Sequence, residues 1–425
     1  MVAVTPAPTG QPDQAYVWVW LPGQTEPVVA GLLRADGDVW VFGYESSYLE
    51  RHDAIALPEL PVQAGWQRPA GGKRVAGVLR DVGPDGWGRR LIHARRLGRD
   101  LDGDYLGLLS YLLEPGSDRI GGLDFQASVE QYVPRVAERT SLAEMQQAVD
   151  ELLAGQPPTA TLGAVVLRGA AVGGARPKVL LRDTAPNGSR RGWVAKLGTH
   201  ADTYPVVRAE AVAMDLAARV GLDVPEVLLD EAAGREVLLV ERFDRVPTAE
   251  SGPQTPVARR VMVSAETIVG LGESTSPEAT YPDFADQIRA RFTDPDQTLR
   301  ELFARIVFNI CISNTDDHPR NHAAFWDGHA FTLTPAYDLC PQSRFGSTAQ
   351  QAMAIDRDGR REGRLSVCLD AAPTYHLDRA DAAEIIEQQV TVIREQWPAA
   401  ADAAHLTAAE RRAMWEHQIL NPTIR

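Results

Sequence analysis

The sequence has few cysteines, no long apolar run and fewer basic than acidic residues. Its three cysteines are Cys311, Cys340 and Cys368, and none stands in a CxxC pair. We therefore expect reduced thiols in a cytoplasmic protein rather than a disulfide scaffold. No stretch of 18 apolar residues occurs, and no basic segment leads into an apolar one at the start. We accordingly expect neither a membrane-spanning helix nor a secretion signal.

The charge balance argues against nucleic acid as a direct ligand. Aspartate and glutamate number 57 against 43 lysines and arginines, which gives a net charge of −14. An acidic surface repels nucleic acid and anionic lipid, so DNA binding by the chain as a whole is not expected. A local basic patch or a basic partner protein could still supply such a surface. The 44% of hydrophobic and 24% of charged residues are ordinary for a globular protein.

Hydrophobic periodicity and turn signals predict a β-rich first half and a helical second half. The Pro- and Gly-rich start, residues 1–14, is expected to be flexible. The first half is predicted to contain a meander over 15–45, helices over 84–97, 105–113 and 141–155, a loop and strand over 116–125, and a strand, glycine-rich turn and strand over 166–181. There follow a strand over 192–197, a helix over 205–220, strands over 224–230 and 235–243, a helix over 298–312, a hairpin around Asp327-Gly328, and helices over 380–396 and 406–418.

The densest polar segment is SNTDDHPRNHAAF, residues 313–325. Asp316 and Asn321 have the D-x-x-x-x-N spacing of the protein-kinase catalytic loop, and Asp317 does not. That spacing aims one carboxylate at a substrate hydroxyl and returns an amide oxygen to the Mg²⁺ on the phosphates. A second metal-binding aspartate should follow a short hairpin, as Asp338 does. Because Asp317 lacks this spacing, the substitution Asp317→Asn is expected to have a mild effect on activity. Alone, the motif also fits a polar capping loop.

Other kinase parts precede this loop in the order found in kinases. The turn over 169–174, which includes Gly173 and Gly174, could cover phosphates with backbone N–H groups. Lys196 stands in V-A-K, and Glu210, fourteen residues later on a helix, could pair with it. A strand lysine and a solvated helix glutamate are the alternatives for these two residues. The segment Glu241–Phe243 ends a strand, where backbone groups could bond adenine.

Two rival functions remain open from the residues. A metal-dependent phosphohydrolase could place metals on a set of four residues, Asp316, Asp317, His318 and Asp338. A catalytically silent kinase-like protein could bind only a regulator. Zinc binding by His318 and His322 is disfavoured, because Pro319 interrupts the helical spacing and the H-E-x-x-H glutamate is missing.

The chain resembles the HipA toxin kinases, the serine/threonine kinases of bacterial toxin–antitoxin modules. The resemblance spans about residues 15–395. Its stretches are DVGPDGWGRR (81–90), SDRIGGLDF (117–125), GGARPK (173–178), VAKL (194–197), RAEAVAMDLAARVGLDVPE (208–226), VERFDR (240–245), NTDDHPRNHAAF (314–325) and LTPAYDL (333–339).

The resemblance implies an α+β, two-lobed protein-kinase-like fold. It implies an extra N-terminal subdomain over 15–130, a β-rich N-lobe core over 131–243 and a helical C-lobe over 244–425. ATP and Mg²⁺ are the implied cofactors. The implied partners are a protein substrate such as an aminoacyl-tRNA synthetase, and a small helix-turn-helix antitoxin that would supply contact with DNA.

The resemblance also implies roles for single residues. Asp316 would be the catalytic base, and Asn321 and Asp338 the metal ligands. The implied nucleotide contacts are Gly173, Gly174, Lys178, Lys196, Glu210, Glu241, Phe243 and His318.

Two positions depart from the family pattern. Family members are typically controlled by phosphorylating a serine in the glycine-rich turn, but this chain has Ala171 there, next to Ala170. We therefore expect no self-inactivation by that route. The family's frequent lysine before the loop asparagine is Arg320, which keeps the positive charge.

Overall fold

The computed structural model describes residues 13–98, 106–136, 140–156, 160–184, 190–246, 257–342 and 349–425. The chain divides into two compact units. The first comprises Met1–His200, Glu231–Arg235 and Asp244–Met262, and the second comprises Ala201–Asp230, Glu236–Phe243 and Val263–Arg425. Both contain helices and strands, which confirms the predicted α+β class. Most of the segment 1–14 lies outside the described residues.

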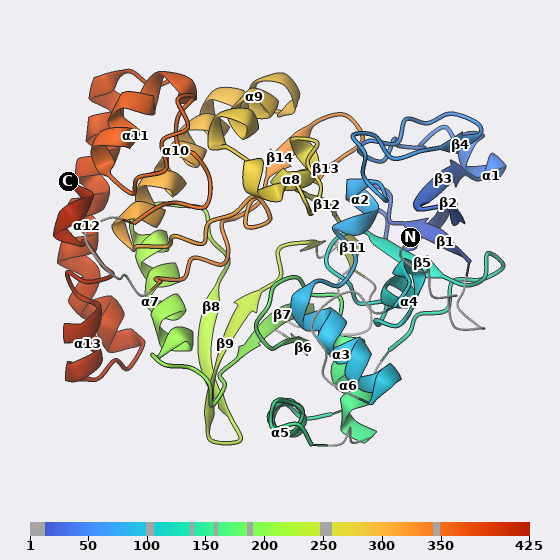
Figure 1. Ribbon diagram of the computed structural model, residues 1–425, viewed down its shortest axis with the longest axis horizontal. Helices are drawn as coiled ribbons and strands as arrows, with labels where there is room; N and C mark the ends of the chain where they lie inside the picture. The colour runs from blue at the N-terminus through green and yellow to red at the C-terminus, as the bar shows by residue number, and fades with distance from the viewer. Residues whose placement is uncertain are drawn as a thin grey trace, which may run out of the picture. The chain divides into compact units, whose positions relative to one another are not determined.

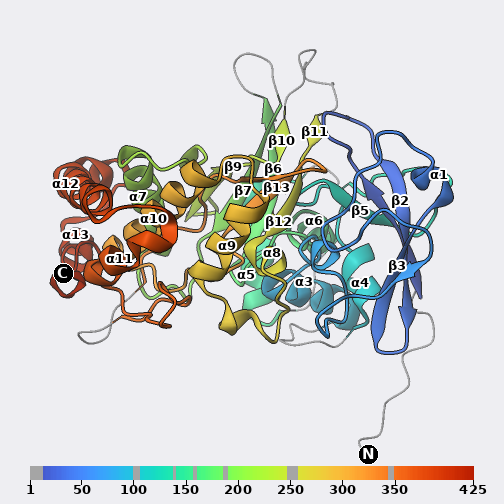
Figure 2. The same ribbon diagram turned by 90° about the horizontal axis from the view of Figure 1, so that it is seen from above.

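An antiparallel five-stranded sheet opens the first unit, with strand order β4-β3-β2-β1-β5 (Figure 1 and Figure 2). Its strands are β1 (Gln14–Val19), β2 (Val28–Asp36), β3 (Val39–Tyr44), β4 (Trp66–Gln67) and β5 (Leu123–Gln126). The predicted meander over 15–45 is confirmed. Gly37, in the turn between β2 and β3, has a φ of +64°, a left-handed conformation that favours glycine.

The remaining elements of the first unit are mostly helical. They are α1 (Ser46–Leu49), α2 (Gly77–Arg80), α3 (Gly86–Leu97), α4 (Leu108–Leu113), α5 (Leu142–Leu153), α6 (Ala160–Gly169), β6 (Lys178–Thr184), β7 (Arg190–Leu197), β10 (Arg245–Val246) and β11 (Ala258–Arg259). Strand β12 (Val261–Ser264) follows. Helix α5 begins as predicted, because Ser141 and Glu144 form a capping box. Strands β6 and β7 pair in antiparallel register.

The prediction of a strand from residue 166 is wrong, because α6 continues to Gly169. Leu162, Val165 and Val166 are buried and recur at helical spacing, so they form one apolar face of α6. A short apolar run fits a buried helix face as well as a strand. The first half is thus more helical than predicted, and the glycine-rich turn follows a helix instead of a strand.

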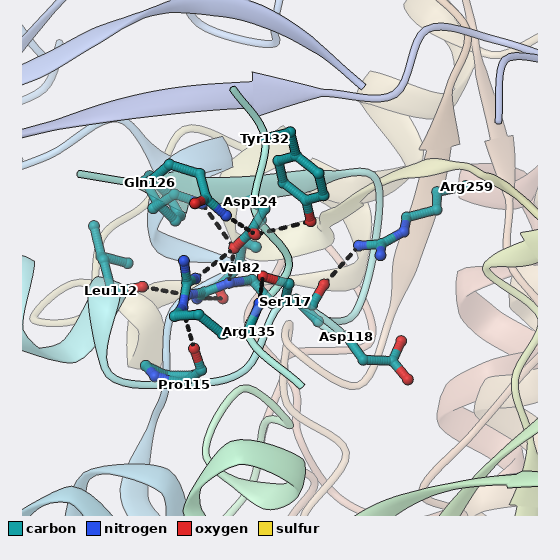
Figure 3. A network of polar contacts seen from close by, with 12 residues as sticks. Val82, Leu112, Pro115, Ser117, Asp118, Asp124, Gln126, Tyr132, Arg135 and Arg259 are labelled. Atoms are coloured by element: carbon teal, nitrogen blue, oxygen red, sulfur yellow. Dashed lines mark hydrogen bonds and ion pairs between the residues drawn. The ribbon is translucent and has the colours of Figure 1, made fainter. Parts of the chain in front are cut away.

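A buried ionic network holds the segment 117–125 together (Figure 3). Asp124 accepts hydrogen bonds from Nε of Arg119 at 2.7 Å and from Nη2 of Arg135 at 2.9 Å. The Tyr132 hydroxyl donates to the same carboxylate at 3.0 Å. Burial would raise the pKa of Asp124, but the two guanidinium groups lower it. Burial lowers the pKa of Arg119 to about 10, so the group stays charged near neutral pH. Since every charge here has a partner, removing one would be strongly destabilising.

The second unit consists mainly of helices. They are α7 (Val206–Arg219), α8 (Ala265–Ile268), α9 (Tyr281–Arg291), α10 (Pro295–Cys311), α11 (Leu365–Ala371), α12 (Arg379–Ala403) and α13 (Ala408–Met414), with short 3-10 turns η1 (Ser276–Glu278), η2 (Ala372–Tyr375) and η3 (Pro422–Ile424). Its strands are β8 (Val227–Ala232), β9 (Arg235–Glu241), β13 (Ala323–Trp326) and β14 (Phe331–Leu333). The hairpin of β13 and β14 forms as predicted.

Helix α7 is fixed to the C-terminal helices of this unit (Figure 1 and Figure 2). Arg208 donates to the carbonyl oxygen of His405 at 3.0 Å and to Glu410 at 2.5 Å. Glu410 also completes the capping box that begins α13. Helix α7 carries Glu210, so these contacts determine where that carboxylate stands in the second unit.

Candidate active site

The predicted site residues fall into two groups, one in each unit. The first unit contains the glycine-rich turn, Lys178 and Lys196, and the second contains the remaining predicted residues. In particular, Lys196 and Glu210 belong to different units. Their predicted pairing stays a prediction, and each group is described by itself.

The loop after α10 is held by hydrogen bonds to its own backbone carbonyl groups. Asn314 N donates to the carbonyl oxygen of Asn309 at 2.8 Å, which ends the helix. His318 N then donates to the carbonyl oxygen of Asp316, and Asn321 N donates to that of His318, both at 2.9 Å. The side-chain nitrogen of Asn321 donates to the Asp316 carbonyl at 3.2 Å. These bonds hold Asp316 and Asn321 on one tight turn and direct the Asn321 amide nitrogen into the loop.

Asp316 is accessible to solvent at its place in this turn. Partial burial of the carboxylate raises its pKa, and the nearby charges of Asp338 and Asp317 raise it further. The charge of His318 acts in the opposite direction. A carboxylate that is accessible, and whose basicity is increased in this way, can accept a proton from a hydroxyl group.

Asp317 has the opposite environment, with a side chain only 2% exposed. Its Oδ2 accepts hydrogen bonds from Nδ2 of Asn309 at 2.7 Å, from Nε2 of His322 at 2.9 Å and from the hydroxyl of Tyr281. Burial alone would raise the pKa of Asp317, but the charge of His322 and the hydrogen bonds from His322 and Tyr281 lower it. The two adjacent aspartates therefore differ in role: Asp317 anchors the loop, and Asp316 faces outward.

This anchoring cluster of Asp317, Asn309, Tyr281 and His322 was missed from the sequence. Tyr281 and Asn309 precede the loop on α9 and α10, and no local pattern links them to it. The one available signal was the unexplained second aspartate. His322 belongs to this cluster, and its ring contacts that of Tyr281 edge to face.

The predicted metal ligands lie close to Asp316. Asp338, in the loop after β14, raises the pKa of Asp316 through its charge. Its φ is +61°, a left-handed backbone that is uncommon for residues other than glycine. The Tyr337 hydroxyl donates to the Arg320 carbonyl at 2.7 Å, which connects this loop to the loop over 313–321. Carboxylate and amide oxygens are the donors that Mg²⁺ prefers, so Asp338 and Asn321 fit this ion.

His318 lies within the same turn, where its Nδ1 accepts from Arg320 N at 3.3 Å. The Nε of Arg320 also lies 3.9 Å from Oε2 of the buried Glu266 on α8. Within the described parts of the chain, no three His, Cys, Asp or Glu side chains gather as a metal site. The buried, hydrogen-bonded environment of Asp317 argues against its use as a metal ligand, which the two-metal phosphohydrolase requires.

The strand end predicted to contact adenine is present in the second unit. Strand β9 ends at Glu241, whose N–H donates to the Glu226 carbonyl at 2.9 Å. The N–H of Glu241 is therefore used within the protein. The ring of Phe243 lies 5.8 Å from that of Tyr337 and 6.0 Å from that of Phe325. Glu210 is buried on α7.

In the first unit, two lysines stand beside the glycine-rich turn. Lys178 on β6 and Lys196 on β7 are direct cross-strand partners, so their side chains start from the same face. Like charges in that arrangement destabilise a sheet. The Nζ of Lys178 donates to the carbonyl oxygen of Gly173. The two lysines place two positively charged side chains on this face, which makes it a candidate phosphate site.

Comparison with known families explains the order of these parts. The family model of the HipA-like C-terminal domain matches residues 170–397, and that of the HipA N-terminal domain matches residues 18–126. The chain belongs to the HipA family. Along the described segments, no helix combines the length and apolar character needed to cross a bilayer.

Individual HipA relatives are distant in sequence. The Sinorhizobium fredii protein named "Putative kinase Y4mE" is 26% identical over 186 residues, 43% of each chain. The serine/threonine-protein kinase toxin HipA of Shewanella oneidensis is 27% identical over 170 residues, 36% of this chain and 38% of the toxin. The chain thus spans about two fifths of the length of the curated relatives it matches.

A solved HipA structure shows the same fold. The HipA, HipB and operator DNA complex of Shewanella oneidensis contains a chain with a TM-score of 0.67 and 17% identity, and the match covers 96% of this chain and 99% of that one. The α+β fold expected from the sequence is therefore the fold of HipA.

Proposed function

We propose that this HipA-family protein is an ATP- and Mg²⁺-dependent serine/threonine protein kinase, and the toxin of a bacterial toxin–antitoxin module. The proposal includes the predicted domain boundaries, which follow residues 130 and 243. The observation that carries it is the contrast at the loop. One aspartate with kinase spacing is accessible next to Asn321 and Asp338, and the next aspartate is buried as an anchor.

In the proposed reaction, Asp316 accepts the proton of a serine or threonine hydroxyl of the substrate. The hydroxyl oxygen forms a bond to the γ-phosphorus as the bond to the β-phosphate oxygen breaks, and ADP leaves. When bound, Mg²⁺ would neutralise charge on the phosphate oxygens. Asn321 and Asp338 would hold the metal through their oxygens.

The remaining predicted residues would hold ATP. Lys178 and Lys196 would bind the phosphates, and Gly173 and Gly174 would approach them through the backbone. Glu210 would pair with Lys196. Adenine would bond the backbone of Glu241 and Phe243, and His318 would contact the phosphates. The cross-strand lysine pair supports this assignment, because its charges favour a bound anion.

The partners follow from the relatives. The Shewanella structure holds HipA with HipB and operator DNA. We propose by analogy that this chain binds a small helix-turn-helix antitoxin and reaches DNA through it, consistent with the net charge of −14. We also propose a cytoplasmic translation component as substrate, such as an aminoacyl-tRNA synthetase, whose phosphorylation would halt growth.

The test is phosphopeptide mass spectrometry on cells that express the wild type or Asp316→Ala, combined with ATP consumption by the purified proteins. A protein kinase yields serine or threonine phosphopeptides that are present with the wild type and missing with the variant. Phosphate release without any protein acceptor would favour a phosphohydrolase. ATP binding without turnover in the presence of a cell extract would favour a silent regulator-binding protein.

A further inference from the structure

The segment Asp85-Gly86-Trp87-Gly88 has no role in the proposed reaction, although it lies in one of the stretches that resemble the HipA family. It begins helix α3 in the first unit. In the same unit it contacts the glycine-rich turn, which follows almost ninety residues later in the sequence. Each of its four residues has a structural role in these contacts.

Two hydrogen bonds join the segment to Gly174. The Asp85 carboxylate accepts from the N–H of Gly174 at 2.7 Å, and the N–H of Trp87 donates to the carbonyl oxygen of Gly174 at 3.1 Å. Both peptide groups of one turn residue are therefore held from the N-terminal side of the chain. Gly174 has a φ of +101°, which a residue with a side chain rarely adopts.

The two glycines of the segment allow this close approach. A Cβ at Gly88 would overlap the carbonyl oxygen of Ala170, and a Cβ at Gly86 would touch the Cα of Ala175 at 3.5 Å. The Trp87 side chain is fully buried and anchors the start of α3. The segment is thus shaped to contact residues 170–175 along their length.

We propose that Asp85 is a positioning residue for the glycine-rich turn, and that the N-terminal part of this chain thereby controls nucleotide affinity. The idea rests on the proposed function, because the turn is taken to bind the phosphates of ATP. The bonds from Asp85 and Trp87 fix the Gly174 peptide, while the Nζ of Lys178 holds the neighbouring Gly173 carbonyl. The turn is then preorganised before ATP arrives, so little ordering remains to oppose binding.

The carboxylate could instead compete with ATP, because it is an anion on an N–H group of the phosphate turn. The two roles predict opposite effects of Asp85→Ala on affinity. A positioning residue strengthens ATP binding, so its loss weakens it. A competitor weakens ATP binding, so its loss strengthens it. The three further contacts of the segment with the turn favour positioning, since a competitor would need only the carboxylate.

The first measurement is hydrogen exchange of the amides over residues 172–176 in the full chain without nucleotide. Asp85→Ala should speed exchange at Gly174 by about tenfold to a hundredfold, the range expected for losing a hydrogen bond to a charged group. Asp85→Asn keeps an oxygen that can accept the bond, and should exchange within about fivefold of the wild type. Asp53→Ala is the matched control, since it removes a surface aspartate of the same unit that pairs with Arg51.

The second measurement is ATP affinity and the kinetic constants of the same variants. We expect Asp85→Ala to raise KM for ATP about tenfold with a much smaller change in kcat, and Asp85→Asn to recover most of that loss. Unchanged exchange at Gly174 in Asp85→Ala would overturn the positioning role, whether or not the protein is a kinase. Tighter ATP binding by both variants would overturn it in favour of competition. If the wild type binds no ATP, the proposed function fails while the exchange result still stands.

Discussion

The glycine-rich turn and the loop over 313–321 both present predicted site residues, but they are held in different ways. The turn is held mainly through its backbone, by Asp85, Trp87 and Lys178, at points where glycines allow close approach. The loop is anchored through one buried side chain, Asp317, which receives three hydrogen bonds.

This difference determines what a mutation does in each region. A change near the turn alters a local conformation that bound ATP would also influence under the proposed function, so ATP affinity should respond before stability does. A change in the anchor of the loop leaves buried polar groups without partners, and such groups are costly to the fold. The two adjacent aspartates give the sharpest form of this contrast, since only Asp317 is buried.

The largest effect is expected for Asp316→Asn. The amide cannot accept the substrate proton, so phosphate transfer should fall by about a hundredfold to ten-thousandfold. ATP should still bind, because the lysines and the turn lie outside the loop. Radiolabel transfer to a protein acceptor measures the first effect, and calorimetric titration with ATP the second. A fully active Asp316→Asn alongside an inactive, folded Asp317→Asn would show that the two assignments must be exchanged.

Asp317→Asn is expected to act on stability first. From the sequence, a mild effect was predicted because the spacing to Asn321 is wrong for catalysis. The buried cluster changes that expectation, since losing the charge weakens bonds from Asn309, His322 and Tyr281. We expect a loss of about 1–3 kcal/mol in the free energy of unfolding. Urea unfolding measures it, with Asp316→Asn as the control.

The pH dependence of the two variants should have opposite signs. The folded pKa of Asp317 is lowered. Its stabilising contribution is therefore complete above the unfolded value of about 3.9, and is lost as the pH falls through the folded pKa. The stability gap between wild type and Asp317→Asn should narrow below about pH 4. The pKa of Asp316 is raised, which means that its ionised form at pH 7 opposes folding. Asp316→Asn should therefore lose no stability at pH 7. A gap of constant size down to pH 3 would contradict the role of Asp317.

An effect on stability of similar size is expected from ligand binding to the intact site. ATP with Mg²⁺ should stabilise the protein by about 2.7 kcal/mol at a hundredfold excess over Kd. Thermal shift measurements should show a smaller gain without Mg²⁺, and Asp338→Ala should remove the difference. Lys196→Met should bind ATP more weakly, because it removes one of the two charges proposed to bind the phosphates. Equal wild-type shifts with and without Mg²⁺ would argue against Asp338 as a metal ligand.

The sequence predicted the parts whose chemistry lies within a few residues. Asp316, Asn321 and Asp338 were chosen by spacing, and the structure brings them together in one unit. What it could not predict depends on long-range contacts. The register that sets Lys178 opposite Lys196 and the contact of Asp85 with Gly174 join distant segments. Helix α6 was mistaken because a short apolar run fits a strand as well as a buried helix face.

The smallest immediate effect is expected at Ala171, and it tests how the turn is regulated. Residues 169–174 contain no hydroxyl group, so the purified protein should carry no phosphate there after incubation with ATP and Mg²⁺. Control would then pass to a bound partner such as the proposed antitoxin. The nearby hydroxyl of Thr161 lies on α6, and Ser189 lies outside the described residues. Phosphosite mapping should find neither modified at full occupancy with a loss of activity.

The substitution Ala171→Ser should restore self-inactivation by phosphorylation of the glycine-rich turn. Serine adds a single hydroxyl group to the buried Ala171, and we expect the variant to start within about twofold of the wild-type activity. A phosphate on that serine adds nearly two negative charges, which a buried position beside Gly174 cannot accommodate. The turn must then leave its contacts with Asp85 and Trp87, and activity should decline as the phosphate accumulates. Intact mass and activity, followed in one time course, measure both changes. If Ala171→Ser becomes fully phosphorylated and keeps its activity, phosphorylation of the turn does not inactivate this protein.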